Sequence, residues 1–486
     1  MPSYGAEEIR QDCDRVLAPF LCHPDLPFAD VITGDDVDRA FVDENAHFGS
    51  RCNAIYTAPL TLWGSLSQGV HKDKTCLGAA LRIGVLLVAL CRSPGDTDSG
   101  TYCRARAKLP PVVLRRLAVQ VGRRLERQVP NSWRWHGRHA MLVDGFTVKM
   151  PDTPENQEQW PQPASQKPGL GFPIMRLVII VSLITACVQD LAYGPYAGKE
   201  TGETALFRTL LAALVAGDVL VFDRYFCSYF MVALALRYGV DVVTRLHQRR
   251  NCDFSRGKRL GTNDHVVEWQ RPVRPEWMTQ EEYETFPKTL TVREIRVYVN
   301  EPGFRVESLV VVTTLLDDEE YTFEDIADLY NERWHVELDI RALKMSLQMD
   351  YLRCQTPFMI EKEIWSNVLS YNLIRKVAAQ AAVRHRLHPR QISFEATRKA
   401  VESSWNVLSE AALPKQLLLG RFLLKELSKK RVGKRPGRTE PRAVKRRPKP
   451  HKLLTKPRAE VKADLLKGQG KDQSGGKAKR SAQQRC

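Results

Sequence analysis

Residues 330–344 read YNERWHVELDIRALK, and their charged side chains fall where a soluble helix does not normally place them. At about 100° per residue, a stripe about 60° wide carries Tyr330, Arg333, Glu337 and Lys344. One apolar flank holds Leu329, Val336, Ile340, Leu343 and Leu347, the other holds Trp334, Leu338 and Met345, and the solvated face is predicted at Glu332, His335, Asp339 and Ser346. The stripe is either an internal ladder of ion pairs, since Arg333, Glu337 and Arg341 are spaced i, i+4, or the wall of a functional site.

The segment from residue 139 to 246, upstream of this helix, has the patterns of strands with two helices among them. Strands are predicted at 141–150, 176–185, 188–196, 218–223 and 241–246, and helices at 202–216 and 228–238. Asp144 lies inside the first strand and Asp223 ends the fourth. The sequence therefore places two carboxylates in strands and a third, Glu337, in a later helix.

Three carboxylates on two strands and one helix suit one kind of chemistry. Cleavage of a phosphodiester with magnesium needs hard oxygen ligands that hold two ions about 3.5–4 Å apart. One ion activates the attacking hydroxyl, and the other stabilises the leaving oxygen. A single aspartate at a strand end is more often structural, so the combination of the three carries the hypothesis.

The spacing Y-x2-R-x3-E-x6-K resembles the signature of bacterial insertion-sequence DDE transposases of the insertion sequence four family. Three more segments are similar to that family: MLVDGFTVKMPDTPENQ, SQKPGLGFPIMRLV and GDVLVFDRYFCSYF. The resemblance implies an α/β fold with an RNase H-like catalytic core. It implies that Asp144, Asp223 and Glu337 form the catalytic triad and bind two Mg²⁺ ions, for which Mn²⁺ can substitute.

The same resemblance implies the reaction and the partners. Tyr330, Arg333 and Lys344 take the positions that contact the DNA end in this family. The expected activity is cut-and-paste transposition, in which the enzyme cleaves at terminal inverted repeats and joins the 3′ ends to target DNA. The family also implies a hairpin intermediate. Because both ends must be held together, a homodimer on double-stranded DNA is expected.

Residues 247–322 are not needed by such a core, and they are interpreted as a β-rich insertion. Strand patterns occur at 265–270, 291–300 and 304–316, the last two about a Glu-Pro-Gly turn. The insertion carries Trp269 and Trp277. In related enzymes an aromatic residue of this region stacks on a base turned out of the transposon end, and Trp269 is predicted for that role because it lies in a strand pattern. Packing in the core of the insertion is the alternative for either tryptophan.

The domain organisation follows from these patterns. Residues 1–138 are expected to form a helical region that binds the DNA end, 139–246 and 323–350 the catalytic core, 247–322 the insertion, 351–428 a C-terminal helical region, and 429–486 a basic, disordered tail. A polar SPGDTDSG loop followed by an arginine-rich helix is compatible with a helix-turn-helix-like reader of DNA. A plain helical bundle is an equally open interpretation of the N-terminal region.

The excess positive charge of the chain lies entirely in the tail. The net charge is +17, and residues 429–486 hold 21 Lys+Arg and 4 Asp+Glu, whereas residues 1–428 hold 52 of each. A neutral body with a basic Pro/Gly-rich extension indicates an arm attracted to polyphosphate. A tail that only improves solubility is the alternative.

Several features favour a protein of the cytoplasm associated with the nucleoid, with no membrane partner. The start MPSYGAEEIR does not have the pattern of a signal peptide, and the apolar runs at 81–90 and 177–184 are far shorter than the ~20 residues of a membrane span. The eleven cysteines include no C-x2-C pair, which argues against a zinc ribbon.

Two other functions remain open from the sequence. A catalytically inactive relative would be a sequence-specific DNA-binding protein that keeps end recognition alone. A structure-specific nuclease on the same core would share the three carboxylates and lack strand transfer.

Overall fold

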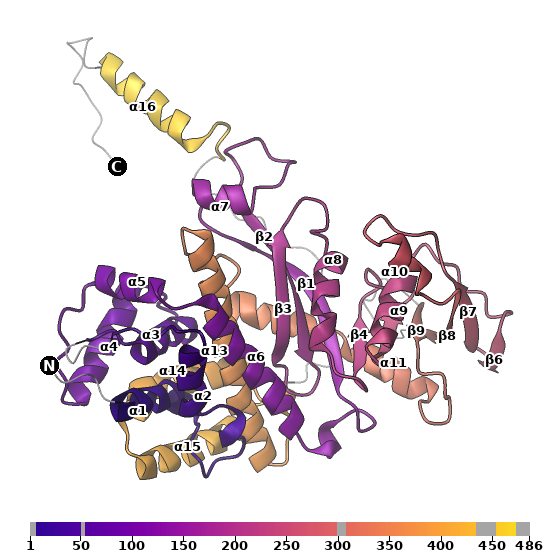
Figure 1. Cartoon of the computed structure of the whole chain (residues 1–486), viewed down its shortest axis with the longest axis horizontal. Coiled ribbons are helices and arrows are strands. Elements are labelled where there is room, and N and C mark those ends of the chain that lie inside the picture. The colour runs from indigo at the N-terminus through magenta and orange to yellow at the C-terminus, as the bar shows by residue number, and fades with distance from the viewer. Residues whose placement is uncertain (1–5, 50–53, 299–307, 434–452, 473–486) are drawn as a thin grey trace, which may run out of the picture.

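A single nine-stranded sheet runs through the centre of the molecule, with helices on both of its faces and a group of helices at one end (Figure 1). The computed structural model describes residues 6–49, 54–298, 308–433 and 453–472. The mixed α/β class expected from the sequence is confirmed.

Five strands form the part of the sheet that carries the predicted aspartates: β1 (Ala140–Lys149), β2 (Ile174–Ser182), β3 (Val188–Pro195), β4 (Val219–Phe222) and β5 (Asp241–Arg245). They lie side by side in the order β3-β2-β1-β4-β5. Strands β1, β2 and β3 are antiparallel neighbours, whereas β4 is parallel to β1 and β5 is parallel to β4. All five predicted strands are confirmed, with ends that differ by a few residues.

The predicted insertion continues this sheet rather than forming a separate one. It contains β6 (Lys258–Gly261), β7 (Asp264–Gln270), the short helix α10 (Gln280–Glu284), β8 (Thr289–Tyr298) and β9 (Ser308–Thr313). Strand β9 pairs with β5, which extends the order to β5-β9-β8-β7-β6. The Glu-Pro-Gly turn predicted at 301–303 lies outside the described residues.

Alternating side chains of the strands supply a core on each face of the sheet. Val143 and Leu220 pack with α8 (Glu203–Leu210) and α9 (Tyr229–Arg237) on one face. Leu142 and Val221 pack on the other face with helices that include α6 (Pro111–Gln128), α11 (Phe323–Glu332), α12 (His335–Arg341) and α13 (Pro357–Arg384). The strands are buried on both faces, which explains their nearly continuous apolar runs.

The two helical regions that the sequence separates pack into one body. The N-terminal helices are α1 (Ala6–Leu17), α2 (Gly34–Asp43), α3 (Ala58–Val70), α4 (Cys76–Ala89) and α5 (Ser99–Ala107); the C-terminal helices after α13 are α14 (Phe394–Glu410) and α15 (Leu413–Ser428). The indole Nε1 of Trp63 donates a hydrogen bond to Ser409 Oγ at 2.8 Å, and the Trp405 ring lies 5.4 Å from those of both Trp63 and Phe20. These contacts join the first 70 residues to the residues near 405.

The basic tail differs from the expectation of disorder at one place. Helix α16 (Arg458–Asp472) forms inside it, because the segment RAEVKADLLK is rich in residues of high helix propensity. The helical body also extends a few residues past the predicted boundary, since Ser393 N donates to Lys430 O and Val432 N to Gln391 O, both at 2.8 Å.

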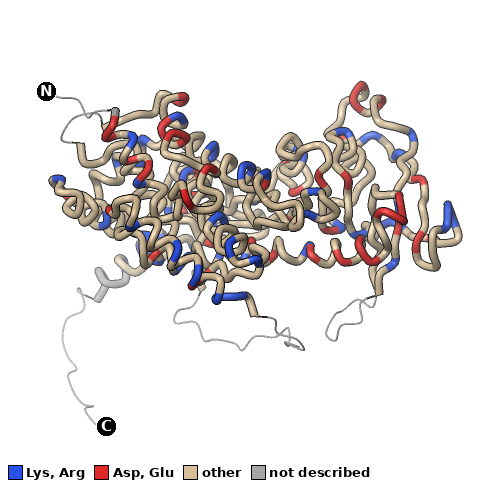
Figure 2. The backbone as a smooth tube through the Cα atoms, turned by 90° about the horizontal axis from the view of Figure 1, so that it is seen from below, with Lys and Arg blue, Asp and Glu red and all other residues tan. Residues whose placement is uncertain are grey.

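Charge is balanced over the described body, where basic and acidic residues are interspersed (Figure 2). Within the described ranges, no helix is both long and apolar enough to cross a lipid bilayer.

A short helix, α7 (Pro154–Gln159), follows β1.

Candidate active site

The predicted helix from Tyr330 to Lys344 is divided into three segments. Helix α11 ends at Glu332, α12 begins at His335, and residues Ala342–Ser346 form one π-helical turn. At the break, Arg333 N donates to Tyr330 O and Glu337 N to Trp334 O, which are i to i−3 hydrogen bonds of a tighter turn. The prediction of one regular helix is therefore wrong, and π-helical turns of this kind are frequent at functional sites.

The division of the helix changes which predicted faces are buried. The flank of Leu329, Val336, Ile340, Leu343 and Leu347 is buried, as predicted. The other flank is exposed, with Trp334 at 57%, Leu338 at 41% and Met345 at 67%, and Asp339, predicted to be solvated, is fully buried. Both expectations fail because a uniform 100° per residue does not hold through a break and a π-helical turn, and because Arg375 and Arg390 reach Asp339 from distant segments.

The register of the sheet brings Asp144 and Asp223 together. Val143 of β1 is paired with Phe222 of β4 in a parallel ladder, and each aspartate is the next residue of its chain. Adjacent strands are about 4.8 Å apart, so the two carboxylates start from neighbouring positions. Successive side chains of a strand point to opposite faces of the sheet. Asp144 and Asp223 therefore point to the same face as Leu142 and Val221, which is the face that α11 and α12 cover.

Glu337 reaches the same place from α12. Its carboxylate Oε1 accepts a hydrogen bond from Arg333 Nη2 at 3.1 Å, and its negative charge raises the pKa of Asp144. Arg333 is in turn influenced by the charge of Asp223. Arg333 therefore lies among all three carboxylates as their counter-ion. The i, i+4 ion pair of the ladder interpretation exists, and it lies inside the candidate site.

Burial is the main influence on the Asp144 carboxyl group. The pKa of Asp144 rises from the usual 3.8 to about 6, with burial as the largest cause and the charges of Glu337 and Glu203 adding to it. The Gly145 amide, which donates to Asp144 Oδ1 at 2.8 Å, and the charge of Arg333 act in the opposite direction. A carboxylate that is costly to ionise in this position gains from any cation placed beside it. This is the behaviour expected of a metal ligand before the metal binds.

Glu203 is a fourth carboxylate of the site, and the sequence patterns did not predict it. It begins α8, burial and the charge of Asp223 raise its pKa, and Arg176 lies beside it at 4.0 Å. A Cβ atom on Gly145 would meet the Glu203 carboxyl carbon at 2.5 Å. A glycine inside a strand is the signal that could have found it, because such a glycine often marks the close approach of another group.

We expect Asp144→Asn to raise the melting temperature of the metal-free protein near neutral pH. Because the pKa of Asp144 is higher in the folded state, the folded protein binds more protons than the unfolded one between pH ~4 and pH ~6, and its free energy of unfolding falls as the pH rises through that window. Asparagine does not titrate, so the difference in melting temperature between Asp144→Asn and the parent protein should grow from pH ~5 to pH ~7.5 in EDTA. Asp328→Asn, at an exposed position of α11, is the control. An advantage that does not change with pH would show that ionisation of the buried carboxyl group is not its cause.

Of the three residues predicted to contact DNA, Arg333 and Tyr330 lie at this cluster, and Lys344 contacts β1 three residues after Asp144. Tyr330 is buried, which raises the pKa of its hydroxyl to about 12, and the charges of Arg333 and Arg245 act on it. Lys344 Nζ donates to Thr147 O at 3.1 Å and pairs with Asp350 at 2.7 Å. The structure adds Arg176 beside Glu203 and Arg245 near Tyr330, and nothing in their sequence spacing indicated this.

Trp269 lies in β7 as predicted, but its indole is only 5% exposed. Its Nε1 donates to Glu294 Oε1 at 2.9 Å, and the guanidinium of Arg250 lies 4.0 Å from the ring centroid. This placement favours the alternative that the sequence left open, a tryptophan of the core of the insertion. Trp277 is half-buried, with Arg208 over its ring at 3.9 Å.

Comparisons with known proteins identify the family of the chain. A family model described as the transposase DDE domain matches residues 135–373, a range that contains Asp144, Asp223 and Glu337. Transposase InsG for insertion sequence element IS4 of Escherichia coli is 24% identical over 349 residues, which are 71% of this chain and 76% of that protein. Putative transposase InsZ of the same organism is 30% identical over 131 residues, 26% of this chain and 42% of that protein.

One solved structure is also similar, the piggyBac transposase synaptic complex with hairpin DNA. It covers 90% of each chain at 12% identity, with a TM-score of 0.42.

Proposed function

Because the chain belongs to the DDE transposases of the insertion sequence four family, we propose that it cuts DNA at the terminal inverted repeats of a transposable element and joins the freed 3′ ends to target DNA. The observation that carries the proposal is the convergence of Asp144, Asp223 and Glu337 about Arg333. The strand order β3-β2-β1-β4-β5, in which β2 is antiparallel to both of its neighbours, supports an RNase H-like core as the scaffold. The predicted domain boundaries are part of the same proposal.

The residues fit the two Mg²⁺ ions that the family implies. The carboxylates of Asp144, Asp223 and Glu337 are hard oxygen donors, and burial together with the charge of Glu337 raises the pKa of Asp144, which makes its ionised form costly without a cation. Glu203 lies across Gly145 on the face of the sheet that α8 covers, and it acts on the cluster through its charge. When bound, the ions would supply activation of the attacking hydroxyl and stabilisation of the leaving oxygen.

The chain's own residues would position the DNA end. Arg333, which neutralises the carboxylates in the metal-free protein, becomes available for the phosphates that flank the scissile bond. Lys344 is held at the rim by Thr147 and Asp350, and Tyr330 is fixed by burial beneath Arg333. Water first attacks the phosphodiester at the element's end; the freed 3′ hydroxyl then attacks the opposite strand, giving a hairpin, or the target DNA.

The partners follow from this reaction. Both ends must be held at once, so we propose a homodimer on two DNA ends, in the cytoplasm at the nucleoid. Trp269 has no place in the proposed end contacts, because its indole is enclosed in the insertion.

The experiment that tests the function follows the products. Purified protein is incubated in Mg²⁺ or Mn²⁺ with labelled DNA that carries both ends of its own element and with a supercoiled target plasmid. A transposase gives 3′ nicks at the element ends and covalent joints to the plasmid. A labelled branched DNA of unrelated sequence is incubated in parallel. Nicks in that branched DNA without joints would identify a structure-specific nuclease, and tight binding to the ends without nicks or joints would identify a DNA-binding protein.

We expect removal of the tail to weaken DNA binding in general without changing its specificity. Truncation after Gly433 keeps the residues that pair with the 389–393 turn and removes 18 Lys+Arg and 4 Asp+Glu. Fewer phosphate contacts release fewer counterions, so the plot of log affinity against log salt should become less steep. The ratio of affinities for element ends and unrelated DNA should stay the same. An unchanged salt slope would mean that the tail does not touch DNA.

A further inference from the structure

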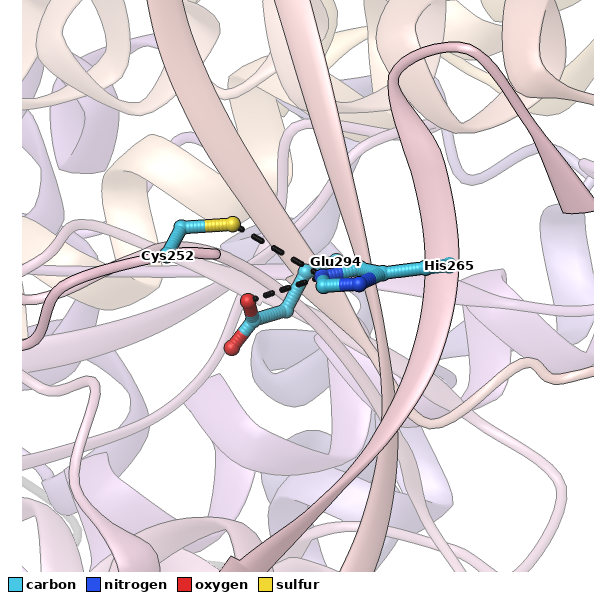
Figure 3. Close-up of side chains that lie close together, drawn as sticks. All are labelled: Cys252, His265 and Glu294. Atoms are coloured by element: carbon cyan, nitrogen blue, oxygen red, sulfur yellow. Dashed lines mark hydrogen bonds and ion pairs between the residues drawn. The ribbon is translucent and has the colours of Figure 1, made fainter. Parts of the chain in front are cut away.

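Three side chains of the insertion point toward one another (Figure 3). Cys252 comes from the loop between β5 and β6, His265 from β7 and Glu294 from β8. One ligand atom from each lies within 4.8 Å of the others. In the part of the chain that the structure describes, this is the single group of three His, Cys, Asp or Glu side chains drawn together so closely.

The sheet fixes two of the three side chains. His265 and Glu294 are directly opposite each other in the antiparallel pair of β7 and β8, so their side chains lie on the same face. Both are nearly fully buried, with exposures of 1% and 4%. The loop carries Cys252 over them, where the thiol is half-buried. Two ligands are therefore rigid, and the third can adjust by a movement of the loop.

The hydrogen bond on the far side of the imidazole sets the orientation of His265. Its Nδ1 lies 2.8 Å from the backbone oxygen of Arg256, which can only accept, so Nδ1 carries the proton. The lone pair of Nε2 then faces Glu294 Oε2 at 3.2 Å and Cys252 Sγ at 3.7 Å. The Cys252 thiol can donate its own proton, but the lone pair of Nε2 and the carboxylate oxygen Glu294 Oε2 cannot face each other at 3.2 Å without a cation between them. That cation is either a proton on Nε2, which gives a simple ion pair with Glu294, or a metal ion.

We propose that Cys252, His265 and Glu294 bind one transition-metal ion, and that the chemistry of these donor atoms selects Zn²⁺. With zinc bonds of about 2.3 Å to sulfur and about 2.0–2.2 Å to nitrogen and oxygen, a tetrahedral site separates sulfur from nitrogen by about 3.6 Å and nitrogen from oxygen by about 3.4 Å. The observed separations are 3.7 Å and 3.2 Å. A thiol and an imidazole select zinc over magnesium. Binding displaces the thiol proton to solvent, and water takes the fourth position.

The surroundings are those of a supported metal site. The Arg256 carbonyl orients His265, the Phe254 ring lies 4.5 Å from the imidazole, and Trp269 Nε1 donates to the second oxygen of Glu294. Such outer contacts fix the donor atoms and shield them. The enclosed Trp269 then has a role, which is to orient a ligand. The ion would tie the loop that leaves β5 to β7 and β8.

The test measures zinc on the full-length protein in a background that cannot hold metal at the other cluster. Asp223→Asn with Glu337→Gln removes two carboxylates there, so the result does not depend on the proposed function. Zinc is titrated against a chromophoric chelator, and bound zinc per chain is counted. Cys252→Ser is the test variant, since serine keeps the shape and the hydrogen bond but is a poor zinc ligand, and Cys91→Ser, at an exposed position in the N-terminal helices, is the matched control.

We expect about one zinc per chain, bound at least ~100-fold more weakly by Cys252→Ser and unchanged in Cys91→Ser. Co²⁺ should give the thiolate charge-transfer absorption in the parent and not in Cys252→Ser. The melting temperature without metal should be the same for both variants, and zinc should raise it only where Cys252 is present. No zinc uptake in the background protein, or equal uptake by Cys252→Ser, would overturn the proposal and leave an imidazolium–carboxylate ion pair.

Discussion

Replacement of Glu337 by glutamine should lower cleavage of element ends in Mg²⁺ by ~10²–10³-fold or more, and Asp144→Asn and Asp223→Asn should do the same. Each substitution removes one negative oxygen donor from a cluster in which few protein oxygens are available for each ion. End binding in the absence of metal should survive or improve, because the carboxylates repel phosphate. Gel-shift affinity and the rate of first-strand nicking, measured on the same DNA, separate the two effects.

Glu332→Gln is the matched control for this experiment. Glu332 is an exposed carboxylate at the end of α11, paired with His335 at 2.7 Å on the side away from the cluster. Its loss should leave nicking within about twofold, since surface ion pairs contribute little. If Glu337→Gln nicks as fast as the control and only melts at a lower temperature, the pair of Arg333 and Glu337 is a structural ladder and the catalytic assignment fails.

Asp339→Asn should destabilise the protein by about 3–5 kcal/mol, because it breaks a buried ion pair by removing one partner. The carboxylate is fully buried and accepts from Arg375 Nη2 at 2.7 Å, Arg390 Nη2 at 2.9 Å and the Tyr371 hydroxyl at 3.1 Å. Without it, two guanidinium groups share a buried space with no opposing charge. The destabilisation is measured as a lower free energy of unfolding in a denaturant titration.

The effect should also reach the active site. Asp339 lies two residues after Glu337, and its two arginines come from α13 and from the turn at 389–391, so the network anchors α12 to the helical body. Asp328→Asn, at an exposed carboxylate on α11, should change stability by no more than about 0.5 kcal/mol. A loss below about 1 kcal/mol for Asp339→Asn would show that solvent reaches the network and screens it.

Much of the catalytic core could be predicted because its signals are local. The strands that carry Asp144 and Asp223 are continuous apolar runs, and a run buried on both faces can be recognised without knowing its neighbours. The start of the arginine-rich helix after the SPGDTDSG loop was likewise local, since Asp98 of that loop caps α5. The spacing of Tyr330, Arg333, Glu337 and Lys344 indicated the family for the same reason.

The sequence by itself determined the five strands of the core, the two aspartates they carry, the family and the charge of the basic tail. The tertiary structure alone decided the partners of those elements: Glu203 against Gly145, the arginines on Asp339, and Cys252 beside the pair of His265 and Glu294. It also decided that Trp269 is enclosed and that the outer flank of α12 is exposed. The physical reason is the distance along the chain over which each interaction acts. Propensity and periodicity act over a few residues, whereas burial and charge pairing depend on which distant segments the sheet register and helix packing bring together, and no local pattern encodes that.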